Sequence, residues 1–377
     1  MDSKSQAAAD SQAAGAAEQG DPAGQSYAAG PVAALRRIAF LLERGREDTY
    51  KIKAFRSAAA AILPLPAGEV EERCRAGSLR DLEGIGASTA QVIADAVAGR
   101  TPQRLAELEA RHVGPLATGG EQLRAALRGD LHSHSDWSDG GSPIEEMAMT
   151  AIELGHDYLV LTDHSPRLRV ANGLSAARLR RQLEVVDAVN GYLAESGFTL
   201  LKGIEVDILD DGGLDQEPDL LAELDLRVAS VHSKLAMDAA PMTRRMIGAV
   251  RNPQTNVLGH CTGRLVTGSR GVRPSSAFDA RAVFEACVEH DVAVEINSRP
   301  ERRDPPTRLL ELARDIGCLF AIDSDSHAPG QLDMLDHGCA RAQAAGIEPE
   351  RIVNTWPRER LLAWANPGRA GASGGGR

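Results

Sequence analysis

Residues Asp130 to Gly140 read DLHSHSDWSDG, and this stretch predicts the start of a metal site at the end of a buried strand. His132 and His134 are separated by one residue, so on an extended strand their side chains point the same way. Asp139 follows five residues after His134, on the loop that the strand would lead into. Taken alone the motif is a moderate signal, because a His-x-His pair also occurs on ordinary protein surfaces.

The rest of the chain repeats this arrangement, since apolar runs of strand length alternate with amphipathic helices. The runs lie near residues 128–133, 157–162, 199–207, 226–231, 256–260, 292–297 and 318–323. Such alternation predicts a parallel α/β sheet with crossover helices. Seven repeats favour a closed, barrel-like arrangement over an open sheet, and in such barrels the chemistry takes place at the carboxyl ends of the strands.

Six of the seven runs end in side chains that can bind a metal ion. After His132 and His134, the candidates are His164, Glu205, His232, His260, Asp325 and His327. The remaining run ends at Glu295 and Asn297, which we expect to contact substrate. A single histidine of this kind is more often a buried core residue than a ligand. Its repetition in successive units favours a metal centre, whereas the other four histidines (His112, His156, His290 and His337) are expected at the surface or at helix caps.

With Asp139 the candidate ligands number nine, which is more than one four- to six-coordinate ion accepts. We therefore expect two or three divalent ions, with Glu205 as a bridging carboxylate. Mixed imidazole and carboxylate donors without a thiolate favour Zn, Mn or Fe over Mg alone. Such ions activate water and bind the oxygens of a phosphoryl group, and we expect catalysis to depend on His132, His134, Glu205 and Asp325.

Residues 31–113 have helical periodicity and contain a Gly84-x-Gly86 turn before a helix. Helix N-termini and turns of this kind bind phosphate through backbone N–H groups. The segment resembles the small N-terminal helix-hairpin-helix domain of family X DNA polymerases. That resemblance implies DNA contacts by Lys51, Lys53 and Arg56, as well as by the two glycines. The alternative is a helical bundle that mediates protein contacts, because 13 Lys and Arg against 11 Asp and Glu leave a net charge of only +2.

Two departures from that polymerase family limit the resemblance. Val92 stands where the family has its lyase lysine, and Schiff-base chemistry requires an amine, so we predict no lyase activity. The polymerase palm, with its catalytic carboxylates, is missing between the helical segment and the histidine motif. The chain is therefore not expected to be a polymerase of this type.

The motifs from His132 to His327 resemble those of the PHP (polymerase and histidinol phosphatase) superfamily, over about residues 129–357. They include the segments TDHS at 162–165, GIE at 203–205, SVHS at 230–233 and DSH at 325–327. The resemblance is strongest to the PHP domains at the C-terminus of bacterial family X polymerases. It implies a distorted (β/α)7 TIM-like barrel with a trinuclear metal site. Lys234, Arg264 and Arg299 follow ligand positions, as Arg270 does, and the first three are expected to contact substrate phosphate.

Three functions are compatible with these features. The leading hypothesis is a metal-dependent phosphoesterase acting on DNA, and the family relatives suggest 3′–5′ exonuclease, 3′-end processing or abasic-site repair. The alternative is a small-molecule phosphomonoesterase of the histidinol-phosphatase type. A third possibility is a DNA-binding module with a silent metal site, but the full set of ligands argues against it.

Composition sets the remaining expectations. The chain has 377 residues, 43% of them hydrophobic, and a net charge of −11, so any contact with nucleic acid must come from a local patch. The five scattered cysteines, the absence of a membrane-length apolar run and the absence of a signal peptide predict a cytoplasmic protein. We expect disordered tails at 1–30 and 366–377, a helical domain at 31–113, a linker at 114–127 and the phosphoesterase domain at 128–365. The sequence does not predict the oligomeric state.

Overall fold

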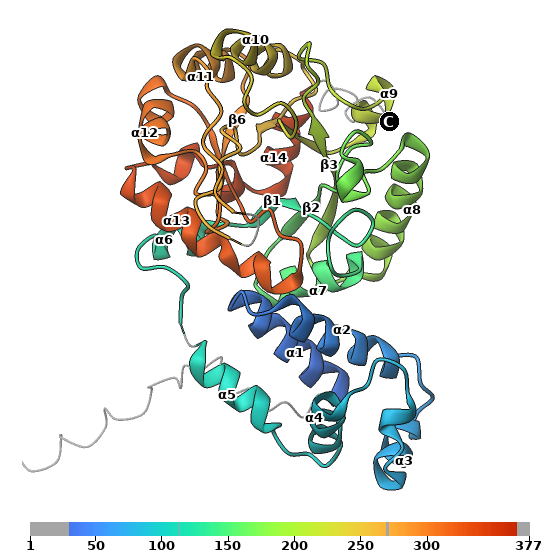
Figure 1. Cartoon of the computed structure of the whole chain (residues 1–377). Helices are drawn as coiled ribbons and strands as arrows, with labels where there is room; N and C mark the ends of the chain where they lie inside the picture. Colours follow the sequence, from blue (N-terminus) through green and yellow to red (C-terminus); the bar gives the residue numbers. More distant parts are fainter. Residues whose placement is uncertain (1–29, 113, 269–270, 368–377) are drawn as a thin grey trace, which may run out of the picture.

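Seven parallel strands form the centre of the larger part of the molecule (Figure 1). The computed structural model describes residues 30–112, 114–268 and 271–367, so Arg270 and almost all of the two predicted tails lie outside the described residues. Each strand pairs in parallel with the next one along the chain. The strands are β1 Gly129–Ser133, β2 Tyr158–Leu161, β3 Thr199–Asp207, β4 Leu226–Ser230, β5 Val257–Leu258, β6 Ala293–Asn297 and β7 Phe320–Asp323. The predicted seven-stranded α/β architecture is confirmed.

The barrel closes between β1 and β7 through side chains more than through a strand ladder. One isolated parallel bridge joins Ser133 to Ser326, and the N–H of His134 donates to the Ser326 carbonyl at 2.7 Å. The buried carboxylate of Asp130 accepts from both the N–H and the hydroxyl of Ser324. The seam between β1 and β7 is therefore irregular, and the barrel is nearly closed.

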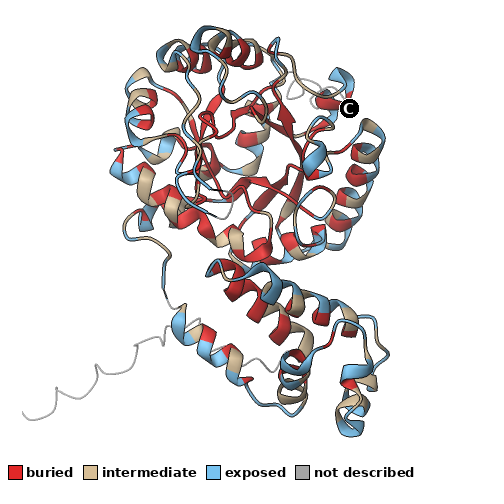
Figure 2. Ribbon diagram, in the orientation of Figure 1, coloured by how far each residue is buried: buried red, intermediate tan, exposed pale blue. Residues whose placement is uncertain are grey.

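Helices cover the outside of the barrel, and both faces of its strands are buried (Figure 2). The helices of this part are α6 Glu121–Ala126, α7 Ile144–Glu153, α8 Ala176–Tyr192, α9 Pro218–Glu223, α10 Ala239–Val250, α11 Ala280–Glu289, α12 Thr307–Ile316, α13 Leu335–Ala344 and α14 Arg358–Ala365. Short 3-10 turns are η3 Arg169–Ala171, η4 Pro329–Met334, η5 Pro349–Arg351 and η6 Val353–Thr355. None of the helices in the described ranges has the length and apolar character needed to span a bilayer.

A separate helical unit precedes the barrel and has its own apolar core around Leu35, Ile38, Phe55 and Ile93. Its helices are α1 Pro31–Arg44, α2 Thr49–Ile62, α3 Glu69–Ala76, α4 Ala87–Val97 and α5 Gln103–Arg111. The helix expected before the glycine turn is only a 3-10 turn, η2 Leu79–Asp81. Gly84 has a φ of 85°, which a residue with a side chain rarely adopts.

The segment 114–127, predicted to be a linker, contains a helix that packs onto the barrel. Leu123 of α6 and the following Leu127 are buried in the barrel core. The N–H of Gly120 donates to the Gln343 side chain of α13 at 2.6 Å. The connection between the two parts is therefore held against the barrel for much of its length.

His156 is buried, not at the surface, and it follows the C-terminal end of α7. Only 5% of the residue is exposed, and neither ring nitrogen has a hydrogen-bond partner among the described residues. Burial, together with the positive charge of Arg124, lowers the pKa of His156 to about 3. The imidazole is therefore neutral in the folded protein at any pH at which the fold is expected to be stable.

Acidification is expected to destabilise the protein through His156. Below its ordinary pKa of about 6.5, the unfolded chain binds a proton that the folded chain does not bind until about pH 3. The free energy of unfolding should thus fall by about 1.4 kcal/mol per pH unit in this range, or about 2 kcal/mol by pH 5. Urea unfolding at a series of pH values gives the slope of the unfolding free energy against pH. For chelator-treated His156→Phe this slope should be smaller by about 1.4 kcal/mol per pH unit. The control His290→Phe, at a partly exposed position, should keep the wild-type slope; equal slopes in all three proteins would contradict the prediction.

Candidate metal centre

The carboxylate of Glu205 lies at the centre of the predicted ligands. Glu205 is in β3 and is 1% exposed. Four histidines from the ends of β1, β2, β4 and β5 surround it. The distances from its oxygens are 3.3 Å to His132 Nε2, 2.9 Å to His164 Nδ1, 3.1 Å to His232 Nε2 and 2.9 Å to His260 Nε2. The parallel strands thus bring together side chains that are far apart in the sequence.

A second group of donors lies nearer the solvent and is called the outer site below. It consists of His134, Asp139, His164 and His327, whose donor atoms all lie within 4.8 Å of one another. Asp139 Oδ1 is 3.3 Å from Nε2 of both His164 and His327. The side chains of Asp139 and His327 are 35% and 20% exposed, whereas His134 is fully buried.

Two further groups share residues with the outer site. Asp325 lies with His132 and His134, and Asp325 Oδ1 is 3.6 Å from His134 Nε2. Glu205, His164 and His232 form the other group. The structure therefore brings all nine predicted ligands to one end of the barrel, in clusters suited to more than one ion.

The donor atoms themselves show that divalent ions fit these clusters. Buried ring nitrogens of His132, His134 and His164, and one oxygen of Glu205, have no hydrogen-bond partner among the described residues. An unpaired buried polar atom costs free energy, and metal ligation would remove that cost. Imidazole and carboxylate donors without thiolate suit Zn, Mn or Fe.

The charges of the cluster favour ionised carboxylates. Burial alone would raise the pKa of Glu205, but the imidazoles of His232, His132 and His164 hold it well below its usual range. Burial lowers the pKa of His134 well below its usual range, and the neighbouring His327 and His164 lower it further. Although burial lowers the pKa of His132, His164 and His232, Glu205 raises it above the usual range, so without metal these rings bind protons that ligation would displace.

Two carboxylates that the sequence did not single out for this role orient ligand histidines. Nδ1 of His132 donates to Glu295 Oε1 at 2.5 Å, which directs Nε2 toward Glu205. Asp207 makes the same contact with Nδ1 of His232. Such partners fix the tautomer and the ring orientation of a ligating histidine. Asp207 lies two residues after Glu205 on the same strand, and this spacing was an available signal; Glu295 was expected to contact substrate.

Asp163 and Asp323, which flank ligand positions in the sequence, have structural contacts. Asp163 accepts hydrogen bonds from Ser135, Ser138 and Gln182 and so secures the loop after β1. Asp323 accepts from the N–H of Leu131 and from the Asn354 side chain. Neither of them bonds to a ligand histidine.

The predicted phosphate-contacting side chains have different surroundings. Arg299 is 9% exposed, and its Nη1 donates to the Asp325 carbonyl at 3.1 Å and lies 3.1 Å from His327 Nδ1. Arg264 donates to the backbone carbonyls of residues 302 and 303, and Lys234 is exposed and paired with Asp210. Their role in phosphate binding stays a prediction. Arg302, which the sequence did not single out, is buried with its Nε 2.9 Å from Asp325 Oδ2.

The predicted DNA-contacting residues also differ from one another. Lys51 and Lys53 of α2 are exposed, although Lys51 lies 3.5 Å from Glu47. Arg56, in contrast, is turned toward the barrel and paired with Glu43 and Glu146 at 2.7 and 3.0 Å. At the turn, the N–H of Gly86 donates to Thr89 Oγ1, while the first N–H groups of α4 have no intrahelical partner. Phosphate binding by Gly84 and Gly86 at this turn stays a prediction.

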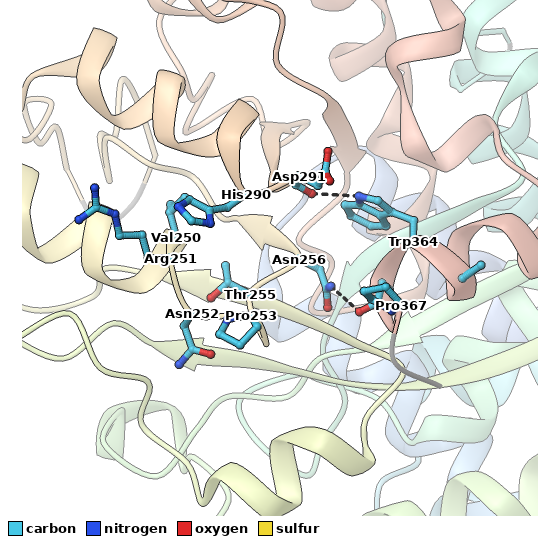
Figure 3. Close-up of a pocket in the computed structure, with 12 residues that line it drawn as sticks. Val250, Arg251, Asn252, Pro253, Thr255, Asn256, His290, Asp291, Trp364 and Pro367 are labelled. Carbon is cyan, nitrogen blue, oxygen red and sulfur yellow. Dashed lines mark hydrogen bonds between the residues drawn. The ribbon is translucent and has the colours of Figure 1, made fainter. Parts of the chain in front are cut away.

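A cavity of about 310 Å³ lies at the opposite end of the barrel (Figure 3). It is lined by the residues before β5 and β6 and by the end of α14, including Asn256, His290 and Trp364. Asn256 donates to the Ala365 carbonyl and Trp364 to the Asp291 carbonyl, both at 2.9 Å. These contacts tie the last helix to the barrel, and no predicted site residue lines this cavity.

Comparisons with known proteins agree with the two-part organisation. Residues 130–299 match the family model described as PHP domain, and residues 29–101 match the one described as helix-hairpin-helix domain. The chain is 38% identical over 228 residues to the DNA polymerase/3'-5' exonuclease PolX of Bacillus subtilis (strain 168). That match covers 60% of this chain but only 39% of the polymerase.

Two smaller proteins match over nearly their whole length. The "Probable phosphatase YcdX" of Escherichia coli O139:H28 (strain E24377A / ETEC) is 30% identical over 244 residues, which cover 62% of this chain and 91% of that protein. A crystal structure of histidinol phosphate phosphatase from Lactococcus lactis, complexed with zinc, L-histidinol and phosphate, matches with 18% identity and a TM-score of 0.44. It covers 59% of this chain and 95% of that one.

Proposed function

Because the chain belongs to the PHP domain family of phosphoesterases, we propose that it hydrolyses phosphate esters of DNA with the help of two or three divalent ions (Zn, Mn or Fe). The observation that supports this proposal is the position of the nine-donor cluster. It lies at the end of the barrel from which η4 and the start of α7 lead to the helix-hairpin-helix unit, and this unit packs beside the barrel. The reactions proposed are 3′–5′ exonuclease cleavage, removal of a 3′ block, or cleavage at an abasic site.

Bound divalent ions would supply an activated water and neutralise charge that develops on the phosphoryl oxygens. The chain's own residues prepare the site for this chemistry. Glu295 and Asp207 hold His132 and His232 with one ring nitrogen turned inward. The buried Arg302 and Arg299 beside Asp325 add fixed positive charge at the same end of the barrel, where an anionic substrate would bind.

The substrate preference can be tested on a panel of DNA ends. Protein loaded with Mn²⁺ would be given oligonucleotides with a 3′-hydroxyl, a 3′-phosphate or an abasic site, and histidinol phosphate in parallel. We expect turnover of at least one DNA substrate and its loss in His132→Ala. Turnover of histidinol phosphate alone would overturn the assignment to DNA while leaving the phosphoesterase assignment intact.

DNA binding is expected to depend on Lys51 and Lys53 and to weaken with salt. Each lost phosphate contact lowers the slope of log affinity against log salt by about 0.9. For the double variant Lys51→Glu/Lys53→Glu, the slope of log affinity against log salt should therefore be shallower by up to about 2. This variant should also bind at least about tenfold more weakly, as measured by fluorescence anisotropy with labelled duplex.

The matched control changes the same charge elsewhere. Arg281→Glu/Arg308→Glu alters two exposed arginines on α11 and α12, away from the helical unit in Figure 1. It should bind DNA as the wild type does. If both double variants weakened DNA equally, the effect would be one of net charge, and residues 31–113 would not be the DNA-binding part.

A small-molecule phosphatase is the second candidate, and a specific observation favours it. The net charge of −11 opposes a polyanionic substrate, and the similarity to the probable phosphatase requires only the barrel. In that case the helical unit would serve in location or assembly.

We also propose a reducing compartment such as the cytoplasm, because the five cysteines are free thiols.

A further inference from the structure

The helical unit rests on the two loops that carry the exposed members of the outer site. α1 lies against η4, which begins two residues after His327, and beside α7, which begins five residues after Asp139 (Figure 1). Leu154, just past α7, packs against the apolar core of the helical unit. The ligand loops therefore lead directly into the segments on which α1 and α2 are packed.

The contact between α1 and η4 leaves no room for a side chain at Gly330. A Cβ added there would lie 2.7 Å from the Cβ of Glu43 and closer still to the Phe40 carbonyl oxygen. The N–H of Gly330 donates to Glu43 Oε2 at 2.8 Å, in a buried position. One residue further on, Gln331 accepts the N–H of His327 at 2.8 Å. Two successive hydrogen bonds thus connect α1 to the backbone of a predicted ligand.

Ion pairs fix the helical unit on both segments, and on η4 the partner of Arg44 is Asp333. Glu43 is 4% exposed and receives two hydrogen bonds from Arg56, at 2.9 and 2.7 Å. The same guanidinium reaches Glu146 of α7 at 3.0 Å, and Arg36 of α1 reaches the other Glu146 oxygen at 2.9 Å. Breaking a buried pair by removing one partner leaves an uncompensated charge and is strongly unfavourable. The unit is therefore expected to stay docked.

We infer that the docked helical unit positions the outer metal site, with Glu43 and Arg56 as positioning residues. His134 and His164 follow β1 and β2 closely and are buried in the barrel end. Asp139 and His327 are the donors on longer loops, and their segments are held where α1 and α2 contact them. Loss of docking should release these two donors and spare the sites around Glu205.

The inference is tested by titrating the full-length, metal-free chain with Zn²⁺ in a calorimeter, which measures the affinity of each ion. Gly330→Ala forces α1 away from η4, and Glu43→Gln removes the charge paired with Arg56. In each variant we expect the weakest ion to bind about 10- to 100-fold more weakly, as when the partner of a ligand is lost. The tighter ions should bind as in the wild type. Hydrogen exchange of a peptide spanning residues 326–335 should become faster in the same variants.

Matched controls separate positioning from general loss of stability. Gly120→Ala places a Cβ 2.5 Å from Ala340 N, where the connection packs on α13 away from the ligand loops. Glu69→Gln removes the partner of Arg73 on α3. Both should retain every ion. If Gly330→Ala does not fold, Glu43→Gln decides the question. Unchanged ion binding despite faster exchange at 326–335, or equal weakening of all ions, would overturn the inference.

Discussion

Replacement of Glu205 by glutamine is expected to lower kcat/KM for phosphate ester hydrolysis by at least about 1,000-fold. Metal ions contribute several kcal/mol of transition-state stabilisation, and about 1.4 kcal/mol corresponds to a factor of ten. Four histidine nitrogens lie between 2.9 and 3.3 Å from the carboxylate oxygens. Glutamine keeps the shape but replaces one oxygen with a donor NH₂ group and removes the negative charge.

Two measurements distinguish loss of metal from loss of fold. Elemental analysis of Glu205→Gln after gel filtration should find at least one ion fewer per chain than in the wild type. Its circular dichroism spectrum should be unchanged. Glu289→Gln, at an exposed position on α11, should keep both the ions and the activity. An active Glu205→Gln protein with its full complement of ions would refute the central position given to this carboxylate.

The strands and the predicted ligands could be found from the sequence because both depend on repetition. Apolar runs recur with amphipathic helices between them, and parallel strands bring their carboxyl ends to one edge. Even β5, only two residues long, could be recognised because the apolar run that contains it ends in His260, as other runs end in predicted ligands. The distances between donors could not be predicted, since these depend on the twist and closure of the barrel.

The contacts of Glu295 and Arg56 could not be assigned from the sequence alone. Glu295 orients His132 from a strand 163 residues away, and no local pattern marks that contact. Arg56 was expected to contact DNA because the corresponding segment does so in the polymerases that it resembles. In this chain the guanidinium of Arg56 pairs with both Glu43 and Glu146. The pair with Glu146 depends on how the two parts of the molecule pack, which the sequence does not show.

Arg245 shows the same limit of sequence reasoning, and its replacement by methionine is expected to lower the free energy of unfolding by about 3 to 5 kcal/mol. Arg245 of α10 is 1% exposed, which is rare for an arginine. Its guanidinium donates to the carbonyl oxygens of Ile208, Leu209 and Ser233 at 3.1, 3.0 and 2.9 Å. Methionine fills much of the volume but leaves these buried acceptors without donors, at a cost of about 1 to 3 kcal/mol each.

The carbonyls bonded to Arg245 belong to the loops that follow β3 and β4, three residues after Glu205 and one after His232. Loss of the guanidinium should therefore loosen this side of the metal centre as well as destabilise the fold. Urea unfolding of the metal-free protein measures the loss of stability, and the affinity for the first Zn²⁺ bound measures the loosening of the metal centre. Arg281→Met on α11 removes an exposed guanidinium that is paired with Glu285, and it should change the unfolding free energy by less than about 0.5 kcal/mol. If Arg245→Met were as stable as this control, water would have to replace all three hydrogen bonds, and the two loops would be held by their own packing.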